Sequence, residues 1–290
     1  MQVSAMKKKI DFILNAREKS IGPEIVLQSL PNRDFRFASP FIVIHHLPPH
    51  HYPPGSPPER LKPHPHRGFA PVTFMFQGEG FHRDSEGNSG ILRAGEVQWM
   101  FAGSGLLHSE GPGNDLLEKG GDYEFVQIWV NVPAIHKMDK PYYQQAKKEE
   151  MPLLFVEQGI ELRLASGNYG NLKGPVKSFT PVTAAFGSVA QNKTLRLIAQ
   201  EGYWTLLYVL DGKITVNQER EVSAHQLVIF NKEATEADIH TNSNAKLLYL
   251  SAEPINEPVA AKGNIVMNTQ EEIARAEKDY AEGKFGILNS

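Results

Sequence analysis

The segment TFMFQGEGFHRDSEGNSGILRAGEVQWM, residues 73–100, decides the fold. It is predicted to form a strand, a glycine turn, a second strand, the hairpin loop SEGNS and a third strand. The segment LLYVLDGKITVNQEREVSAHQLVIF, residues 206–230, has the same order of strand, glycine turn, strand, short connection and strand. The two segments therefore predict an internal duplication of one small β-barrel.

Strand-like runs also surround these two segments. They are RFASPFIVIHHL at 36–47 and EFVQIWVNVP at 124–133 in the first half, and TLRLIAQ at 194–200 and AKLLYLSAEP at 245–254 in the second. Short strands separated by glycine-rich turns are typical of a β-sandwich or a β-barrel. The sequence thus predicts an all-β fold.

The chain is long enough for two domains of about 100–150 residues each. Between the β-rich halves, DKPYYQQAKKEEMPLL at 139–154 is polar and lysine-rich, and it is predicted to be a linker with a short helical piece. We place the two domains at residues 1–145 and 146–290. The segment NTQEEIARAEKDYAEGKFG at 268–286 is predicted to form an amphipathic helix, which polar residues cap and Gly283 ends.

The composition is that of an ordinary globular protein, with 41% hydrophobic and 22% charged residues. The net charge of -3 gives no basic surplus, so neither nucleic acid nor a membrane is expected as a partner. The run KKK at 7–9 is interpreted as a solvated face. The absence of cysteine excludes disulfides, iron–sulfur clusters and thiol catalysis. Because no signal peptide or membrane span is evident, we expect a cytoplasmic protein.

Histidine is concentrated in one part of the chain. Eight of the 11 histidines lie between His45 and His108. The segment LKPHPHRGF at 61–69 places His64 and His66 on either side of a proline. Proline favours extended geometry in the preceding residue, and residues two apart in an extended chain share a face, with Cα atoms about 6–7 Å apart. Two imidazoles at this spacing can bind one metal ion.

The other half of such a site is predicted in GSGLLHSEG at 103–111. His108 and Glu110 are again two residues apart, in a strand that follows a glycine turn. Together the two segments would supply three imidazoles and one carboxylate. This ligand set suits one divalent ion of Fe, Mn, Ni, Co or Cu and, less well, Zn; Fe(II) is our first choice and the others stay open. Alternatively, each pair is only a loop feature.

Other polar residues of this half allow two interpretations. HHLPPHHYPPGSPPE at 45–59 is interpreted as a proline-rich loop, either solvated or folded over the site as a lid. His82 either points into the barrel, as a base or a supporting group, or is structural. Gln98 and Trp99 could line the pocket, although Trp99 could equally belong to the core. Three histidines are interpreted as structural or surface residues: His136, His225 and His240.

Several motifs together resemble the pirin family of the cupin superfamily. They are HPHRGF, HRDSEGNSG, GEVQWMFAGSGLLHSE, PINEP and GNIVMNTQEEIARAEKDYAEGKFG. The resemblance implies two cupin barrels packed face to face, a metal, usually iron, in the N-terminal barrel alone, and a degenerate C-terminal copy. It implies four metal ligands: His64, His66, His108 and Glu110. The chain departs from the family at Ala70, where relatives commonly have Glu.

The resemblance also implies two candidate functions. Some pirins resemble quercetin 2,3-dioxygenases, which open the central ring of a flavonol with O2. Glu110 would then deprotonate the flavonol hydroxyl, with His82 as the runner-up. Candidate pocket walls are Phe74, Phe76 and Trp99. Other pirins are metal-dependent regulatory proteins. The first function implies a small-molecule substrate, a flavonol or a similar enolisable aromatic, together with O2, and the second a protein partner. For both we expect a monomer.

Overall fold

The computed structural model describes residues 6–289. Their contacts divide into two compact units. The first, the histidine-rich barrel, comprises Glu18–Val26, Ser39–Lys147 and the described part of Ile255–Ser290. The second barrel comprises the described part of Met1–Arg17, Leu27–Ala38 and Lys148–Pro254. Each unit therefore combines segments that are distant in the sequence.

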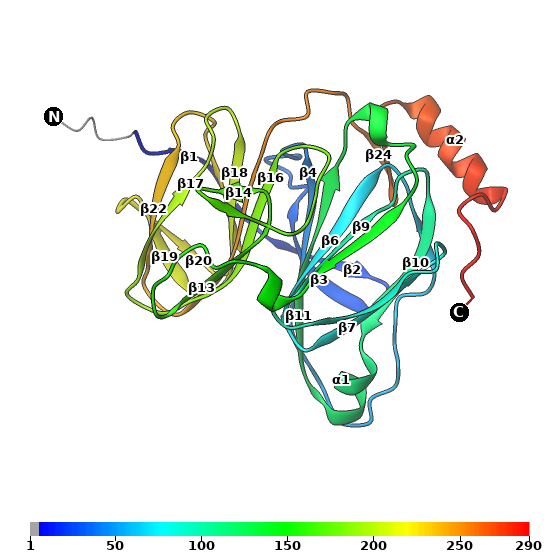
Figure 1. Ribbon diagram of the computed structural model, residues 1–290, viewed down its shortest axis with the longest axis horizontal. Helices are drawn as coiled ribbons and strands as arrows, with labels where there is room; N and C mark the ends of the chain where they lie inside the picture. Colours follow the sequence, from blue (N-terminus) through cyan, green and yellow to red (C-terminus); the bar gives the residue numbers. More distant parts are fainter. Residues whose placement is uncertain (1–5, 290) are drawn as a thin grey trace. The chain divides into compact units, whose positions relative to one another are not determined.

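The histidine-rich barrel contains a seven-stranded and a four-stranded sheet (Figure 1). The strands of the larger sheet, in spatial order, are β12 (Tyr142–Ala146), β9 (Val97–Phe101), β6 (Phe69–Gln77), β11 (Gly121–Asn131), β4 (Phe41–Tyr52), β3 (Glu24–Leu30) and β2 (Arg17–Ile21). Those of the smaller sheet are β5 (His64–His66), β10 (Leu106–Pro112), β7 (Glu79–Asp84) and β8 (Ser89–Arg93). Short helices are α1 (Asn114–Lys119) and η1 (Ala134–His136).

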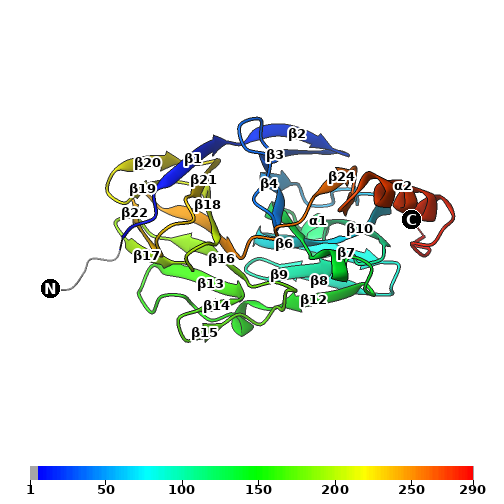
Figure 2. The ribbon, with the colours of Figure 1, turned by 90° about the horizontal axis from the view of Figure 1, so that it is seen from above.

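The second barrel has a six-stranded and a four-stranded sheet (Figure 2). The larger contains, in spatial order, β1 (Ile10–Asn15), β21 (Gln226–Phe230), β18 (Trp204–Asp211), β23 (Ala245–Ala252), β16 (Val182–Val189) and β13 (Ile160–Ser166). The smaller contains β17 (Thr194–Ile198), β22 (Glu236–Thr241), β19 (Lys213–Val216) and β20 (Arg220–Ser223). Remaining elements are β14 (Asn168–Tyr169), β15 (Leu172–Lys173) and η2 (Lys148–Glu150).

The predicted duplication is confirmed by the strand order. The order β9, β6, β11, β4 in one barrel matches β21, β18, β23, β16 in the other, and the order β5, β10, β7, β8 matches β17, β22, β19, β20. Where β5 and β10 carry histidines, β17 and β22 pair Leu195 with Ile239 and Leu197 with Ala237. All four are buried apolar residues, so the second barrel is a copy without the ligand chemistry.

The predicted C-terminal helix is confirmed as α2 (Gln270–Ala281). It begins with a capping box between Thr269 and Glu272 and packs on a hairpin of β24 (Ala260–Lys262) and β25 (Ile265–Met267). Asp279 of this helix forms an ion pair with Arg67, the residue after His66, at 2.8 Å. No helix between residues 6 and 289 has the length and hydrophobicity of a membrane span.

The histidine–proline segment forms a strand up to Tyr52, so the prediction of a loop was wrong there. The ladder between β4 and β11 pairs Leu47 with Phe125 and His50 with Tyr123, so the two prolines between them fall in a register shift. Proline lacks an N–H group and is tolerated in a sheet at such bulges. The prolines therefore bend the strand without ending it.

Two polar runs also have long-range partners that the sequence did not reveal. Residues 142–146 of the predicted linker form β12, at the edge of the seven-stranded sheet beside β9. In the basic run, predicted to be solvated, Lys8 is 1% exposed and its ammonium donates to the carbonyl of Asn231, while Lys7 pairs with Glu236. In both cases tertiary pairing overrides local polarity.

Candidate metal centre

Strand pairing brings the two predicted histidine segments together. In the four-stranded sheet β5 lies beside β10, with His64 opposite His108 and His66 opposite Leu106. The turn before β10 contains Gly103 and Gly105, whose φ angles of 46° and 121° suit glycine. The glycine turn thus begins the strand that presents His108, as the sequence predicts.

The three imidazoles converge on one point. The ring centroids lie 4.3 Å apart for His64 and His108, 4.6 Å for His66 and His108, and 5.0 Å for His64 and His66. One nitrogen of each ring lies within 4.8 Å of the other two. Because a metal–imidazole bond is about 2.0–2.1 Å long, this is close to the spacing of ligands that share one ion.

The hydrogen bonding of these rings fits a metal site. His64 Nδ1 donates to the Lys62 carbonyl at 2.8 Å, which leaves Nε2 free to act as a ligand. The ring nitrogens of His66 and His108 are buried without a hydrogen-bond partner in the described chain, although the backbone of Asn264 lies near His66. Burial, and then the neighbouring imidazoles, hold the pKa of both rings well below the usual range. They are therefore neutral and keep a lone pair for a metal.

Glu110 lies two residues after His108 on the same strand and lines the cavity of the barrel. Among the residues described, the group of convergent ligand atoms consists of the three histidines and does not include this carboxylate. Gln127 on β11 fixes the carboxylate, since its Nε2 lies 2.9 Å and 3.1 Å from the two oxygens. A role for Glu110 as the fourth ligand stays a prediction.

His82 is buried behind His108. Its Nε2 lies 3.4 Å from the Asp84 carboxylate, and its Nδ1 lies 3.3 Å from the amide of Gln98. Its ring lies 5.4 Å from that of His108 and stacks on Tyr143 at 5.0 Å. These contacts fix the ring against a candidate ligand, while its role as a base remains a prediction.

Tyr143 is a site residue that the sequence interpretation missed, because it lies in the segment predicted to be a linker. Its hydroxyl donates to the side-chain oxygens of Gln98 and Gln145, at 3.3 Å and 3.1 Å. The available signal was the alternation in YYQQA, which places Tyr143 and Gln145 on one face of a strand.

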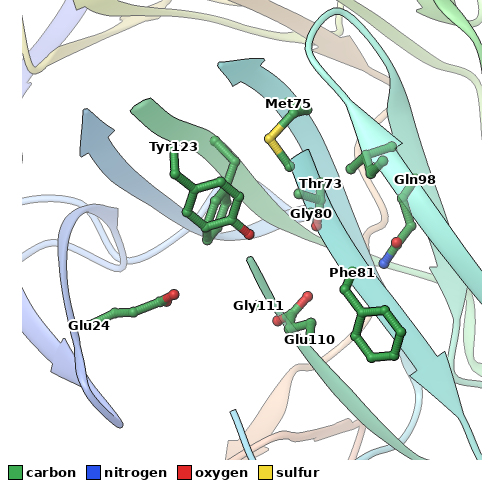
Figure 3. A pocket seen from close by; sticks show the side chains of 11 residues that line it. Glu24, Thr73, Met75, Gly80, Phe81, Gln98, Glu110, Gly111 and Tyr123 are labelled. Carbon is green, nitrogen blue, oxygen red and sulfur yellow. The ribbon is translucent and has the colours of Figure 1, made fainter. Parts of the chain in front are cut away.

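A cavity of about 20 Å³ lies beside Glu110 inside the histidine-rich barrel (Figure 3). The side chains of Glu24, Glu110, Tyr123 and Gln98 point toward it in Figure 3. The remaining lining residues are Thr73, Met75, Gly80, Phe81, Leu92, Gly111 and Phe125. The cavity therefore combines apolar walls with two carboxylates, a phenol and an amide.

On β6, the residues that line the cavity are shifted by one position along the strand from those predicted. Thr73 and Met75 line the cavity, and the predicted Phe74 and Phe76 do not, because successive residues of a strand face opposite sides. Trp99 is not in the wall either, whereas Gln98 lines it as predicted. Ala70 shares the face of Phe74, so the departure from the family at this position leaves the cavity wall unchanged.

Glu24 is the second residue that sequence interpretation missed. It begins β3, and burial, followed by the Glu110 carboxylate, raises its pKa to about 7. Burial and the same carboxylates raise the pKa of Tyr123 well above its usual range, so that hydroxyl remains a donor. No local pattern marks Glu24, because only the folding of the sheet brings it to the cavity that Glu110 lines.

Two of the four histidines of β4, His45 and His46, are buried and are not part of a lid, whereas His50 and His51 are exposed. His45 is 4% exposed and lies opposite Gln127 in the ladder with β11. Burial lowers its pKa to about 3, so the ring is neutral. His46 is buried, with Nε2 3.3 Å from the Glu124 carboxylate. The strand thus contributes neutral imidazole to the barrel wall.

Family comparison matches both barrels. The model described as Pirin matches residues 25–130, and the model described as Pirin C-terminal cupin domain matches residues 187–286. Each match includes most strands of one copy of the strand pattern, and the second also extends through α2, which belongs to the histidine-rich barrel. This agrees with the duplication seen in the structure.

Relatives match nearly the full chain. A Pseudomonas aeruginosa protein, whose name provisionally assigns quercetin 2,3-dioxygenase activity, is 34% identical over 97% of this chain and 99% of its own. Pirin-1 of Arabidopsis thaliana is 33% identical, with 77% of each chain covered. The crystal structure of quercetin 2,3-dioxygenase from Acinetobacter baumannii has a TM-score of 0.92 and 33% identity, and covers 98% of this chain and 100% of its own. The chain therefore belongs to the pirin family.

Proposed function

We propose that this protein is a metal-dependent dioxygenase of the quercetin 2,3-dioxygenase type, acting on flavonols or similar enolisable aromatics. The observation that carries the proposal is the convergence of His64, His66 and His108. The rings of His66 and His108 are buried and neutral, and their nitrogens have no hydrogen-bond partner in the described chain. The A. baumannii quercetin 2,3-dioxygenase, with its high structural similarity, supports the reaction class.

The three histidines would hold the metal, with Glu110 as the proposed fourth ligand and Fe(II) as the proposed ion. Bound there, such an ion would supply activation of O2 and would make a coordinated hydroxyl more acidic. The neutral imidazoles of His66 and His108 supply lone pairs without adding charge. His66 and His108 are 2% and 0% exposed, and this burial limits the access of water.

Glu110 is the proposed base. Its carboxylate lines the cavity, and Gln127 fixes its orientation, so an oxygen of Glu110 can accept the hydroxyl proton of a substrate. His82 is the alternative base. Both of its ring nitrogens have partners, in Asp84 and Gln98, and this arrangement suits a residue that positions His108.

One observation favours the second candidate, a non-catalytic metal- or redox-sensing regulatory protein that acts through protein partners. The cavity of about 20 Å³ is too small for a flavonol with the side chains in their present positions. A cavity of this size holds about one water molecule. A catalytic role therefore requires further space for the substrate.

The test is a single-turnover experiment. Protein loaded with Fe(II) under anaerobic conditions is mixed with quercetin and then exposed to air. We expect the flavonol absorption band to disappear with matching uptake of O2, and we expect neither in His108→Ala. Wild-type protein that holds iron and leaves quercetin intact would refute the dioxygenase and favour the regulatory role.

A further inference from the structure

A second pocket of the histidine-rich barrel offers the space that the inner cavity lacks. Its volume is about 310 Å³, and Glu24 lines both the pocket and the cavity. Pockets for small molecules are typically about 300–1,000 Å³. The outer pocket is therefore large enough for an aromatic group of a ligand whose other end reaches the inner cavity at Glu24.

The walls of this outer pocket are mainly apolar and rigid. They come from the start of β3 and from the proline bulge of β4: Pro23, Ile25, Leu47, Pro48, Pro49 and Tyr52. Tyr52 makes edge contacts with His50, at 4.7 Å, and with Tyr123 of the inner cavity, at 6.1 Å. Proline rings and an edge-packed phenol provide flat surface for a planar ring.

The polar groups of the outer pocket are the carboxylates of Glu24 and Glu59, the imidazole of His50 and the hydroxyl of Tyr52. Glu24 and Glu59 contribute carboxylates, and the residues that line the pocket, all within the described chain, include no lysine or arginine. Carboxylates accept hydrogen bonds from hydroxyl groups and repel anionic ligands. The pocket therefore favours a neutral ring that carries hydroxyl donors.

We propose that the outer pocket is a subsite for the hydroxylated ring of an aromatic polyol, and that Glu24 selects ligands with a hydroxyl group on that ring. Glu24 accepts the hydrogen bond at the junction of the two spaces, while the enolisable end of the ligand lies toward Glu110. This inference rests on the proposed function, since it names the class of aromatic that the site would accept.

The test is equilibrium binding by calorimetry with protein loaded with Zn(II), compared for quercetin and for 3-hydroxyflavone, which lacks the other ring hydroxyls. At pH 8, above the Glu24 pKa of about 7, we expect Glu24→Gln to lower affinity for quercetin about tenfold and to leave affinity for 3-hydroxyflavone the same, because a charged acceptor is lost. Ile25 is 58% exposed. In Ile25→Trp the indole should fill the pocket and lower the affinity for both flavonols. Glu118→Gln makes the same charge change at an exposed position of α1 and should alter neither affinity.

The outcomes separate this proposal from the proposed function. The subsite proposal is wrong if Glu24→Gln binds quercetin with wild-type affinity, or if Ile25→Trp binds both flavonols with wild-type affinity. This holds even if the iron-loaded protein oxidises quercetin. The expected binding differences without turnover sustain the subsite and refute the dioxygenase. Wild-type protein that binds neither flavonol refutes both.

Discussion

His64 and His108 are the residues on which the metal assignment depends most directly. Substitution of either by alanine removes one of three convergent nitrogens, and we expect the metal content after gel filtration to fall at least about tenfold. Elemental analysis measures this. His136→Ala is the control, because its ring pairs with Asp139 away from the site. Wild-type metal content in both ligand variants would show that these histidines do not bind the ion.

Gln127 tests whether Glu110 completes the ligand set. Gln127→Leu removes both hydrogen bonds to the carboxylate, and affinity for Zn(II) should fall about 10–100-fold if the carboxylate is a ligand. Competition with a chromogenic chelator gives the affinity. Thr73→Val removes only a 3.4 Å contact to Gln127 and should have little effect. Equal affinities for Gln127→Leu and wild type would argue against Glu110 as a ligand.

Glu24 makes the stability of the metal-free protein depend on pH. Burial, and then Glu110, raises its pKa from 4.5 to about 7. Between these values unfolding releases a proton, so the free energy of unfolding falls as pH rises, and levels off above about pH 7. Glu24→Gln stays neutral, so its free energy of unfolding should rise relative to that of the wild type across this window, by about 3 kcal/mol at pH 8.

Thermal unfolding of both proteins at pH 4.5 and pH 8 measures that gain. The exposed variant Glu118→Gln should show no comparable trend. A stability difference between Glu24→Gln and wild type that is the same at both pH values would mean that the folded protein does not perturb the Glu24 carboxyl.

For single residues, the sequence predicted which histidines converge, but it did not predict the cavity walls on β6 or the role of Glu24. The spacing of His64 and His66 was informative because strand geometry fixes which residues share a face. The walls on β6 were not predictable, since apolar residues occupy both faces of a buried strand and a shift of one residue reverses them. Glu24 was missed because its role depends on a partner strand.

Among the structural elements, the turn that contains Lys137 joins three segments of the histidine-rich barrel. The buried ammonium donates to the carbonyls of Gly68 and Val266 and to the side chain of Asn131. Lys137→Met leaves three buried acceptors without this donor and should lower the free energy of unfolding by about 3 kcal/mol or more. Urea unfolding measures this.

The matched control for that substitution is Lys140→Met, at an exposed lysine three residues further along. It should change the free energy of unfolding by less than about 0.5 kcal/mol. A loss below about 1 kcal/mol in Lys137→Met would indicate that the three acceptors find other donors, and that the lysine does not hold the segments together.

Elements with their own sequence signal were predictable, and elements that depend on partners were not. The capping box of α2 and the hairpin loop between β7 and β8 are local features, and both lie where the sequence places them. β4 contains two prolines and β12 is polar, and both are strands because neighbouring strands pair with them. Local polarity and proline content do not report such pairing.

For the whole molecule, the duplication has a consequence for metal stoichiometry. The second barrel fills the positions of the ligand strands with leucine, isoleucine and alanine, so we expect one divalent ion per chain. Calorimetric titration with Zn(II) should give a stoichiometry of one for the wild type and near zero for His108→Ala. A second ion of similar affinity would contradict the assignment of the second barrel as a copy without ligands.

Metal removal should also lower thermal stability. An ion that binds only the folded chain adds about 2.7 kcal/mol when its free concentration is 100 times the Kd. Treatment with a chelator should therefore lower the Tm of the wild type by several degrees, and that of His108→Ala hardly at all. Identical shifts in the two proteins would mean that the chelator acts elsewhere.

The ion pair between Arg67 and Asp279 joins two residues that the ribosome synthesises at different times. Arg67 follows the candidate ligand His66, and its guanidinium also packs on Phe285, 4.5 Å from the ring centroid. All of Lys148–Pro254, which belongs to the other unit, is translated between them. At about 5–20 residues per second, the ribosome needs roughly 10–40 s to translate the 212 residues from Arg67 to Asp279. The candidate ligand histidines are therefore synthesised before the residues that anchor their strand. During this time the site is incomplete and is exposed to the metal ions and chaperones of the cell.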